Sequence, residues 1–429
     1  MNDNDRSIVA FAMLAHATVH TYELSIPIFV VIWLQQFPVT TATLGSVVAV
    51  GYALFGIGAL PGGVLADRLG AKTLVIVCLL GMGGSFLLLG FAPGVPTIAV
   101  ALGLWGIAAS VYHPAGLSLL STGVDERGTG FAYHGMAGNV GIAFGPLATA
   151  LLLLAFDWQT VAWLLVVPAG LAVLYAVTAE FDEMAAVSTD GGEREGGADR
   201  ADGAATGETG LLASLRAFLV DARMLFTAGF ALAICVVLMN GLFYRGVLTF
   251  LPDVLGSFLP PITDYVTLFE PGSAMAQQFD LASYVYAGLL TVGIGGQYVG
   301  GKLTDRIPVT TGLLAVFAGL AVVAVLFVPA AQAGLGPLLA VSALLGFLLF
   351  AIQPLYQATI AEYSPPDDRG LSYGFTYLAN FGVGAAGAAL AGILLSVVGT
   401  DGTFLALAAF PALGAGLALA LSRVDAVRP

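Results

Sequence analysis

The chain has 429 residues, of which 58% are hydrophobic and 10% are charged, and its formal net charge is −13. A soluble domain carries about 25% charged residues, so this composition excludes a water-soluble fold of this length and favours lipid as the solvent. No enzyme constellation and no phosphate-binding loop of the form Gly-x-x-x-x-Gly-Lys-Ser/Thr stands out, so we expect neither enzyme activity nor a cofactor.

Twelve long apolar runs follow one another along the chain, and a helix needs about 20 such residues to cross a hydrocarbon core of about 30 Å. In chain order the runs are 8–34, 42–66, 73–92, 96–121, 130–155, 158–178, 224–251, 280–302, 309–329, 334–361, 371–398 and 402–422. A backbone in lipid has to satisfy its own hydrogen bonds, so we predict that every run is a helix.

One stretch between the runs has a different composition. Residues 179–210 are rich in Gly, Ala and acidic residues, which predicts a disordered linker, and 211–222 resemble a short interfacial helix. A Pro-rich loop is expected over 252–279. The predicted organisation is an N-terminal six-helix half at 1–178, an acidic linker with the interfacial helix at 179–222, and a C-terminal half at 223–429.

The positive charges are distributed unevenly between the loops. If the twelve runs alternate in direction, 13 of the 14 Lys and Arg residues fall on one face, and only Arg245 does not. Lys and Arg mark the cytoplasmic side of a membrane protein. We therefore predict a multi-pass protein of the cell membrane, with both termini in the cytoplasm.

The two halves repeat one another at a nearly constant offset. Gly63-Val-Leu-Ala-Asp-Arg in the first half corresponds to Gly301-Lys-Leu-Thr-Asp-Arg in the second, 238 residues later. Further matches join His113-Pro114 with Gln353-Pro354, Arg127-Gly128 with Arg369-Gly370, and Asn139 with Asn380. These repeats predict an all-α membrane protein of twelve transmembrane helices in two pseudo-symmetric six-helix halves, with a substrate site between the halves.

The stretch GGVLADRLGAK, between the second and third runs, resembles the loop signature of the major facilitator superfamily. The resemblance covers the whole chain and implies alternating access, with a cytoplasmic gate of charged residues that holds one state closed. It assigns to this gate Gly63, Asp67, Arg68, Gly70, Lys72, Arg127, Asp305, Arg306 and Arg369. Anchoring of the helix ends at lipid headgroups is the alternative interpretation of these charges.

A narrower resemblance is to the fosmidomycin-resistance branch of efflux carriers. The segments VYHPAGLSLLS, DERGTGFAYHGMAGNVGIAFGP, YRGVLTFLP and HATVHTYELSIP are similar to elements of that branch. Where that branch suggests an acid in the first span, this chain has His20, and Glu23 follows one turn later.

His16, His20 and Glu23 have the spacing i, i+4, i+7, so they share one face of the first helix. Ionisable groups inside a span are costly and usually face a cavity or a partner. We predict that this stripe lines a central cavity and that all three residues are candidates for binding a proton. A metal site and structural hydrogen bonding are alternatives, and we assign no metal there.

Arg245 is the one cation inside a span, and a guanidinium stays charged there. It needs a carboxylate partner, such as Glu23, or an anionic substrate; reaching out to the lipid headgroups is the alternative. Other polar or aromatic residues of the spans are predicted to line the cavity, with helix packing as the alternative: His113, Asn139, Asn240, Tyr244, Gln353, Gln357, Tyr377 and Asn380. The stripe from His134 to Gly145 is predicted to serve close helix packing.

The predicted function is transport of a small organic solute by alternating access, as proton-coupled efflux, with an anionic solute as one option. Uptake or facilitated diffusion of a small organic anion is the first alternative, and a non-transporting membrane sensor or scaffold is an alternative of another class. The expected partners are the lipid bilayer, the solute and protons, without nucleic acid, and a monomer is expected.

Overall fold

The computed structural model describes residues 1–39, 41–153, 155–188, 222–259 and 281–424. The first half contains α1 (Asp3–Gln36), α2 (Thr41–Ile57), α3 (Ala59–Leu69), α4 (Ala71–Gly90), α5 (Val95–Ser110), α6 (Tyr112–Gly123), α7 (Arg127–Leu153), α8 (Trp158–Leu164) and α9 (Val166–Thr178). The connection begins with α10 (Ala185–Ser188). The second half contains α12 (Ala228–Phe258), α14 (Leu281–Thr304), α15 (Val309–Gln332), α16 (Leu335–Glu362), the 3-10 turn η2 (Pro366–Asp368), α17 (Arg369–Tyr377), the π-helix η3 (Leu378–Gly382), the 3-10 turn η4 (Val383–Ala385), α18 (Ala386–Leu407) and α19 (Ala409–Leu421).

Four of the helix breaks have the same cause. A proline has no N–H for the carbonyl four residues earlier, and its ring clashes with that carbonyl. In each of these places the helix ends at the residue four positions before a proline. The pairs of last helical residue and proline are Ile57 and Pro61, Ser110 and Pro114, Leu164 and Pro168, and Leu407 and Pro411. Pro114 therefore separates α5 from α6.

By length and hydropathy, nine helices of the described chain are able to cross a membrane, or ten if the pair α2–α3, bent by 45°, is one span. One of the nine runs over Pro366–Leu421, and 56 residues of helix would be about 84 Å long at 1.5 Å per residue. Gly399, with a φ of 69° inside α18, divides it into two spans. With these two spans, the bent pair and the 24-residue α14, the all-helical fold of twelve spans is confirmed.

Two predicted boundaries were wrong. Helix α12 does not end before Pro252 but continues to Phe258, so the predicted loop 252–279 begins later than expected. The first part of the predicted disordered linker is attached to the first half, because the Glu183 carboxylate accepts the backbone N–H of Lys72 at 2.9 Å. The predicted interfacial helix 211–222 and the remaining linker and loop residues lie, except for Ala222, outside the described residues.

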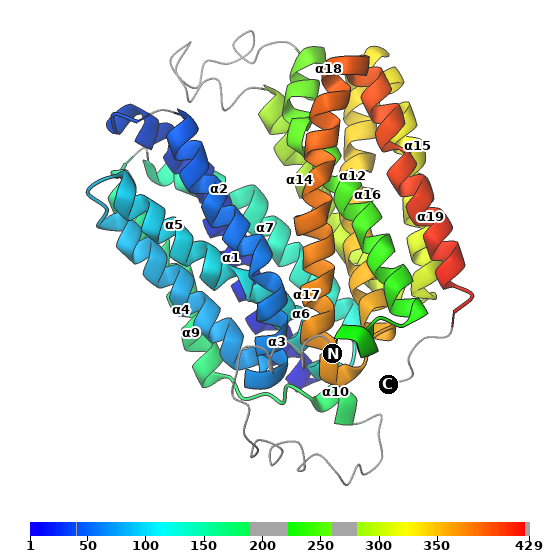
Figure 1. Ribbon diagram of the computed structural model, residues 1–429, viewed down its shortest axis with the longest axis horizontal. Helices are drawn as coiled ribbons and strands as arrows, with labels where there is room; N and C mark the ends of the chain where they lie inside the picture. Colours follow the sequence, from blue (N-terminus) through cyan, green and yellow to red (C-terminus); the bar gives the residue numbers. More distant parts are fainter. Residues whose placement is uncertain (40, 154, 189–221, 260–280, 425–429) are drawn as a thin grey trace.

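The helices α1 to α9 form one bundle and α12 to α19 form the other (Figure 1). The bundles touch where α3 lies against α17 and where α7 lies against α14. Glycines allow this approach, since a Cβ on Gly63 would lie 2.2 Å from the carbonyl oxygen of Gly370. At one end of the molecule the halves are joined by contacts of Asp67, Thr129, Asp305 and Arg369. We call this end the closed end, and the amino terminus lies there (Figure 1).

Candidate functional site

The first contact of the closed end caps a helix. Asp67, at the end of α3, accepts the backbone N–H groups of Gly370 and Leu371 at 2.7 and 2.8 Å. These N–H groups belong to the first turn of α17, where the backbone has no partner of its own and the helix dipole favours a negative charge. Asp67 of the loop signature therefore closes the first half onto the second without an ion pair.

The second contact is the pseudo-symmetric counterpart of the first. Asp305, which follows α14, accepts a hydrogen bond of 2.7 Å from the Thr129 hydroxyl in the first turn of α7. Lys302 donates to the same hydroxyl at 2.8 Å. Thr129 was not among the predicted gate residues, although its place in the turn after Arg127 could have indicated it.

Arg369 and Arg127 lie at equivalent places in the two halves. The Arg369 side chain is buried and donates from Nη1 to the carbonyl oxygen of Ser121, near the end of α6, at 3.2 Å. A cation at the carbonyl end of a helix is stabilised by the helix dipole. Arg127 begins α7, and its charge acts on the carboxylate of Glu362 at the end of α16.

The other predicted gate residues do not join the halves by ion pairs. Arg68 and Arg306 are exposed. Lys72 donates to the carbonyl oxygen of Ala179 at 2.9 Å, so it holds the start of the linker. Gly70 ends α3 with a φ of 84°, a left-handed conformation that glycine adopts without strain. The gate of charged residues that the resemblance implies is thus built differently: the carboxylates of Asp67 and Asp305 accept hydrogen bonds from the first turns of α17 and α7.

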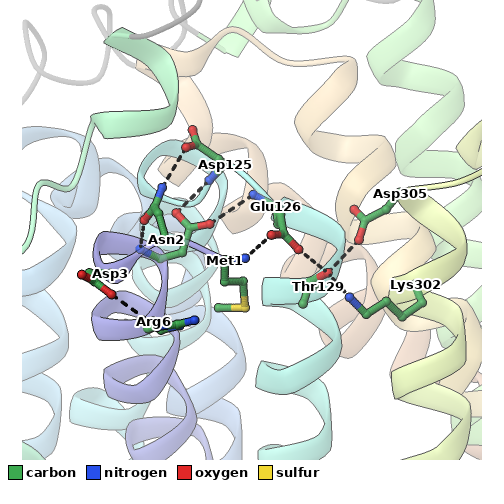
Figure 2. A network of polar contacts seen from close by, with 10 residues as sticks. Met1, Asn2, Asp3, Arg6, Asp125, Glu126, Thr129, Lys302 and Asp305 are labelled. Atoms are coloured by element: carbon green, nitrogen blue, oxygen red, sulfur yellow. Dashed lines mark hydrogen bonds and ion pairs between the residues drawn. The ribbon is translucent and has the colours of Figure 1, made fainter.

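The amino terminus of α1 continues the closed end (Figure 2). The amino group of Met1 pairs with the Glu126 carboxylate, and this hydrogen bond is the main reason that the pKa of Glu126 is lowered. Glu126 also accepts a hydrogen bond from Thr129 at 3.3 Å. Asp5 is buried and accepts the backbone N–H of Asp125 at 3.1 Å. The start of α1 is therefore linked to the hydroxyl that Asp305 and Lys302 share (Figure 2).

A central cavity of about 230 Å³ lies between the halves. Most of the residues predicted from sequence to face a cavity line it: His16, His20, Glu23, His113, Asn139, Tyr244, Arg245, Gln353, Gln357 and Tyr377. A neighbouring cavity of about 480 Å³, lined in part by α2 and η3, shares Glu23 and Arg245 with it. The two charged residues of the spans therefore lie where both cavities meet.

All four histidines of the chain meet beside the cavity. The ring nitrogens Nε2 of His16 and His20 lie 3.0 Å apart, and Nδ1 of His20 lies 2.7 Å from the Glu23 carboxylate. His113 contacts both rings edge-on, with centroid distances of 5.3 and 5.4 Å. His134, which was assigned to helix packing, stacks on His16 with centroids 3.8 Å apart and accepts its Nδ1–H through the backbone carbonyl at 2.7 Å.

The glycines of the His134 stripe do serve packing. A Cβ on Gly138 would lie 2.4 Å from the His16 ring, and one on Gly141 would lie 2.4 Å from the carbonyl oxygen of Ala17. The small residues let α7 approach α1 closely enough for the histidine rings to stack. The same close approach explains why sequence spacing along α7 alone did not show that His134 belongs to the cluster.

Arg245 and Glu23 face the same cavity, but no ion pair within 4 Å joins them, which differs from the predicted pair. The reason is that the Glu23 carboxylate is taken by His20. The Arg245 guanidinium lies 4.8 Å from the centre of the Phe381 ring, and its Nε atom has no hydrogen-bond partner in the described chain. Arg245 lies in the middle of α12 and lines the cavity, so it does not reach out to the headgroups.

Two predicted cavity residues lie elsewhere. Asn240 donates to the Asn380 side-chain oxygen at 3.1 Å, and neither residue lines the cavity. Their shared hydrogen bond holds α12 to η3, so packing takes them out of reach of a solute. Gln353 accepts a hydrogen bond of 2.7 Å from Gln297 and still faces the cavity.

The tyrosines Tyr286 and Tyr356 line the cavity although the sequence analysis did not select them. Tyr286 lies on α14 and Tyr356 on α16, within long apolar segments where aromatic residues are common. No sequence pattern separates them from core tyrosines. Together with Tyr244 and Tyr377 they give the second half's side of the cavity an aromatic wall.

The chain contains the string Gly370-Leu-Ser-Tyr-Gly374, which has the form of the nucleophile turn of some hydrolases. In the structure the string lies within α17, not between a strand and a helix. The Ser372 side chain is buried and donates to the carbonyl oxygen of Asp368 at 2.7 Å. Ser372 is therefore a packing residue, in agreement with a non-enzymatic protein.

Comparison with known proteins gives one family for the whole chain. A model of the Major Facilitator Superfamily matches residues 9–258 and 254–429. The uncharacterized transporter YfnC of Bacillus subtilis is 29% identical over 339 residues, 76% of this chain and 71% of that protein. Puromycin resistance protein pur8 of Streptomyces alboniger is 36% identical over 143 residues, 33% of this chain and about a quarter (26%) of that protein.

A crystal structure of the transporter FucP in an outward conformation has the same fold. It has a TM-score of 0.70 at 14% sequence identity and covers 98% of this chain and 99% of its own. The likeness at this identity concerns the fold alone. The family model, which matches nearly the whole chain, shows that the chain belongs to the major facilitator superfamily and is a transporter, not an enzyme.

Proposed function

We propose that this transporter exports a small organic solute in exchange for protons. The observation that carries the proposal is that one cavity between the halves gathers Glu23, His20 and His16, which can bind a proton, with Arg245, while the halves are joined at one end. A carrier needs these two features, a buried site and an end that closes. The relative named for puromycin resistance supports efflux, and so do the segments resembling the fosmidomycin-resistance branch.

The proton site consists of Glu23, His20 and His16, connected by hydrogen bonds of 2.7 and 3.0 Å. In an exchange of solute for protons, both must compete for one site. A solute that donates a hydrogen bond to the Glu23 carboxylate binds only when that carboxylate is ionised. A proton on this network then releases the solute, and its departure prepares the site for the next solute molecule.

The closed end is proposed to lie in the cytoplasm of the cell, under the cell membrane, with both chain termini on that side. The loops and adjoining helix ends of this end carry Arg68, Lys72, Arg127, Arg306 and Arg369. Lys and Arg are enriched on the cytoplasmic side of membrane proteins. The cavity would then be reached from the outside in this state, and a monomer contains the complete cavity.

A second candidate is uptake of a small organic anion together with a proton. Arg245 favours it, because within the described chain its guanidinium has no carboxylate within 4 Å and its Nε has no partner, so an anion is its natural partner. Protonation of Glu23 would remove the competing negative charge from this cavity and strengthen anion binding. The sign of this coupling therefore separates the two candidates: protons weaken solute binding in an exchanger and strengthen it in a symporter.

The test measures solute movement in vesicles that contain the purified protein, with and without a pH gradient. Puromycin represents organic cations and benzoate represents aromatic anions. We expect that the gradient drives accumulation of one probe in the wild type and that Glu23→Gln abolishes this accumulation but keeps exchange of labelled for unlabelled probe. Glu180→Gln, at an exposed position outside the cavity, is the matched control. Full gradient-driven accumulation by Glu23→Gln would rule out the proton role.

A further inference from the structure

The hydrogen bonds of the histidine cluster fix which nitrogens carry hydrogen. A carbonyl oxygen only accepts, so the contact of 2.7 Å between His16 Nδ1 and the carbonyl oxygen of His134 places the hydrogen on Nδ1. An ionised Glu23 also only accepts, so its contact of 2.7 Å with His20 places a hydrogen on Nδ1 of that ring. In neutral rings both Nε2 atoms then carry a lone pair.

These two lone pairs point toward one another. The Nε2 atoms of His16 and His20 are 3.0 Å apart, and both side chains are buried. Two bare lone pairs at this distance repel each other, so the arrangement requires a positive charge between them. One additional proton meets this requirement, and it is the proton of the proposed transport cycle. A metal ion meets it equally well.

The cluster has the donor set of a transition-metal site. The ligand atoms of His16, His20 and His113 all lie within 4.8 Å of one another. Zinc binds imidazole at about 2.0–2.1 Å in a tetrahedron, which places two nitrogen ligands about 3.3–3.4 Å apart. The Nε2 distance of 3.0 Å is close to this value. His113 Nδ1 is buried without a hydrogen-bond partner in the described chain, so this ring can turn toward an ion.

The surroundings of the rings match those of metal ligands. Metal-binding histidines usually donate their other nitrogen to a carbonyl or a carboxylate, which holds the ring in place. His16 does so to the carbonyl of His134, and His20 does so to Glu23. All three candidate ligands also line the central cavity, so an ion has a route to them and a fourth position stays open.

We propose that His16, His20 and His113 bind a divalent transition-metal ion of the zinc type, in the place of the shared proton. Neutral imidazole nitrogens suit Zn²⁺ and Co²⁺ and do not suit Mg²⁺ or Ca²⁺. The ion enters from the cavity and displaces the proton that lies between the two Nε2 atoms. The proposal goes beyond solute transport, because the ion binds whether or not a solute is moved.

Binding of the ion has to weaken as the pH falls, since protons compete for the same nitrogens. The titratable and charged groups that face the cluster are Glu23 on α1, Tyr112 on α6, His134 on α7, Arg245 on α12 and Tyr377 on α17. Of these, ionised Glu23 offsets part of the ion's charge, and Arg245 opposes it.

The experiment uses the full chain in detergent, freed of any polyhistidine tag, with Co²⁺ as the optical probe and Zn²⁺ as the competitor. We expect one equivalent of Co²⁺ with the intense visible bands of a tetrahedral site, and displacement by Zn²⁺. His113→Gln and His16→Gln should weaken binding by about tenfold or more, and Glu23→Gln, which removes a supporting group, by about tenfold. Glu180→Gln, at an exposed position outside the cluster and the cavity, is the matched control.

Two results would overturn the proposal. One is a wild-type protein that binds no stoichiometric Co²⁺ or Zn²⁺ at neutral pH. The other is equal binding by His16→Gln, His113→Gln and the wild type, with thermal unfolding showing that all are folded. Failure of the transport proposal is recognised separately, since Arg245→Gln should lose benzoate movement yet keep the Co²⁺ spectrum.

Discussion

The closed end and the central cavity use the pseudo-symmetry of the fold in opposite ways. At the closed end each half contributes the same device, a carboxylate after its second span that meets the first turn of a helix in the other half, as Asp67 and Asp305 do. In the cavity the halves differ. The first half supplies three histidines and Glu23, and the second supplies Arg245, both glutamines and all four tyrosines of the lining.

This difference suggests a division of labour. On the proposed function, the duplicated contacts of Asp67 and Asp305 serve the opening and closing of the two halves. On the proposed function, the cavity has a proton side on α1, α6 and α7 and a solute side on α12, α14 and α16. Coupling of proton movement to solute movement then requires an electrostatic interaction across the cavity between Glu23 and Arg245.

The largest expected effect tests the solute side. Arg245→Gln removes the one cation that, within the described chain, faces the cavity from the second half. Loss of a buried charge partner costs about 2–5 kcal/mol, or roughly 30-fold to several thousand-fold. We expect this loss in benzoate exchange, with a smaller loss in Arg245→Lys, which keeps the charge. Exchange of puromycin should change less than tenfold.

The control for this experiment is Arg423→Gln, an exposed arginine after α19. If Arg245→Gln impaired benzoate and puromycin equally, Arg245 would serve the structure of the carrier and not the recognition of an anion. The division between a proton side and a solute side would then lose its main support.

An intermediate effect tests the closed end. Asp67 accepts two backbone N–H groups and Asp305 accepts one hydroxyl, so Asp67→Asn should open this end more than Asp305→Asn does. A hydrogen bond to a charged group is worth about 1.5–3 kcal/mol, so we expect about a tenfold shift of the equilibrium for Asp67→Asn. Spin labels at the exposed positions of Arg68 and Arg306 report the distance between the halves.

The labels need a background without Cys78 and Cys235, which are both free thiols. Asp3→Asn is the matched control, since its side chain is fully exposed in the structure. Equal distance distributions for Asp67→Asn and Asp305→Asn would show that the two contacts carry the same share of the closure. The different numbers of hydrogen bonds that Asp67 and Asp305 accept would then make no difference to the free energy of closure.

Much of the fold and of the candidate site could be predicted from the sequence, and there are physical reasons why the rest could not. Hydropathy located the spans because the bilayer requires long apolar helices, and the repeat of Gly-x-Leu-x-Asp-Arg located the closed end. The partner of Asp67 was not predictable, because it is a pair of backbone N–H groups, which leave no mark in a sequence.

The cavity shows the same limit. The helical spacing of His16, His20 and Glu23 placed them on one face, but the stacking of His134 depends on the approach of α7 to α1. The prediction that Asn240 and Asn380 line the cavity was made from residue type and helical spacing. The structure pairs them with each other, because two polar side chains in lipid lower their cost most when they share a hydrogen bond.

The smallest expected effect concerns this pair. Hydrogen bonds between membrane helices contribute about 0.6 kcal/mol on average, so Asn240→Ala and Asn380→Ala should each lower the free energy of unfolding only slightly. In the double variant the two losses should not add, and the coupling energy should be about 0.6 kcal/mol. Stability is measured by unfolding in mixed micelles, and exchange of benzoate and puromycin should remain near wild type. A loss of exchange as large as that of Arg245→Gln would instead place both asparagines on the solute side, which would require them to reach the cavity in another state of the carrier.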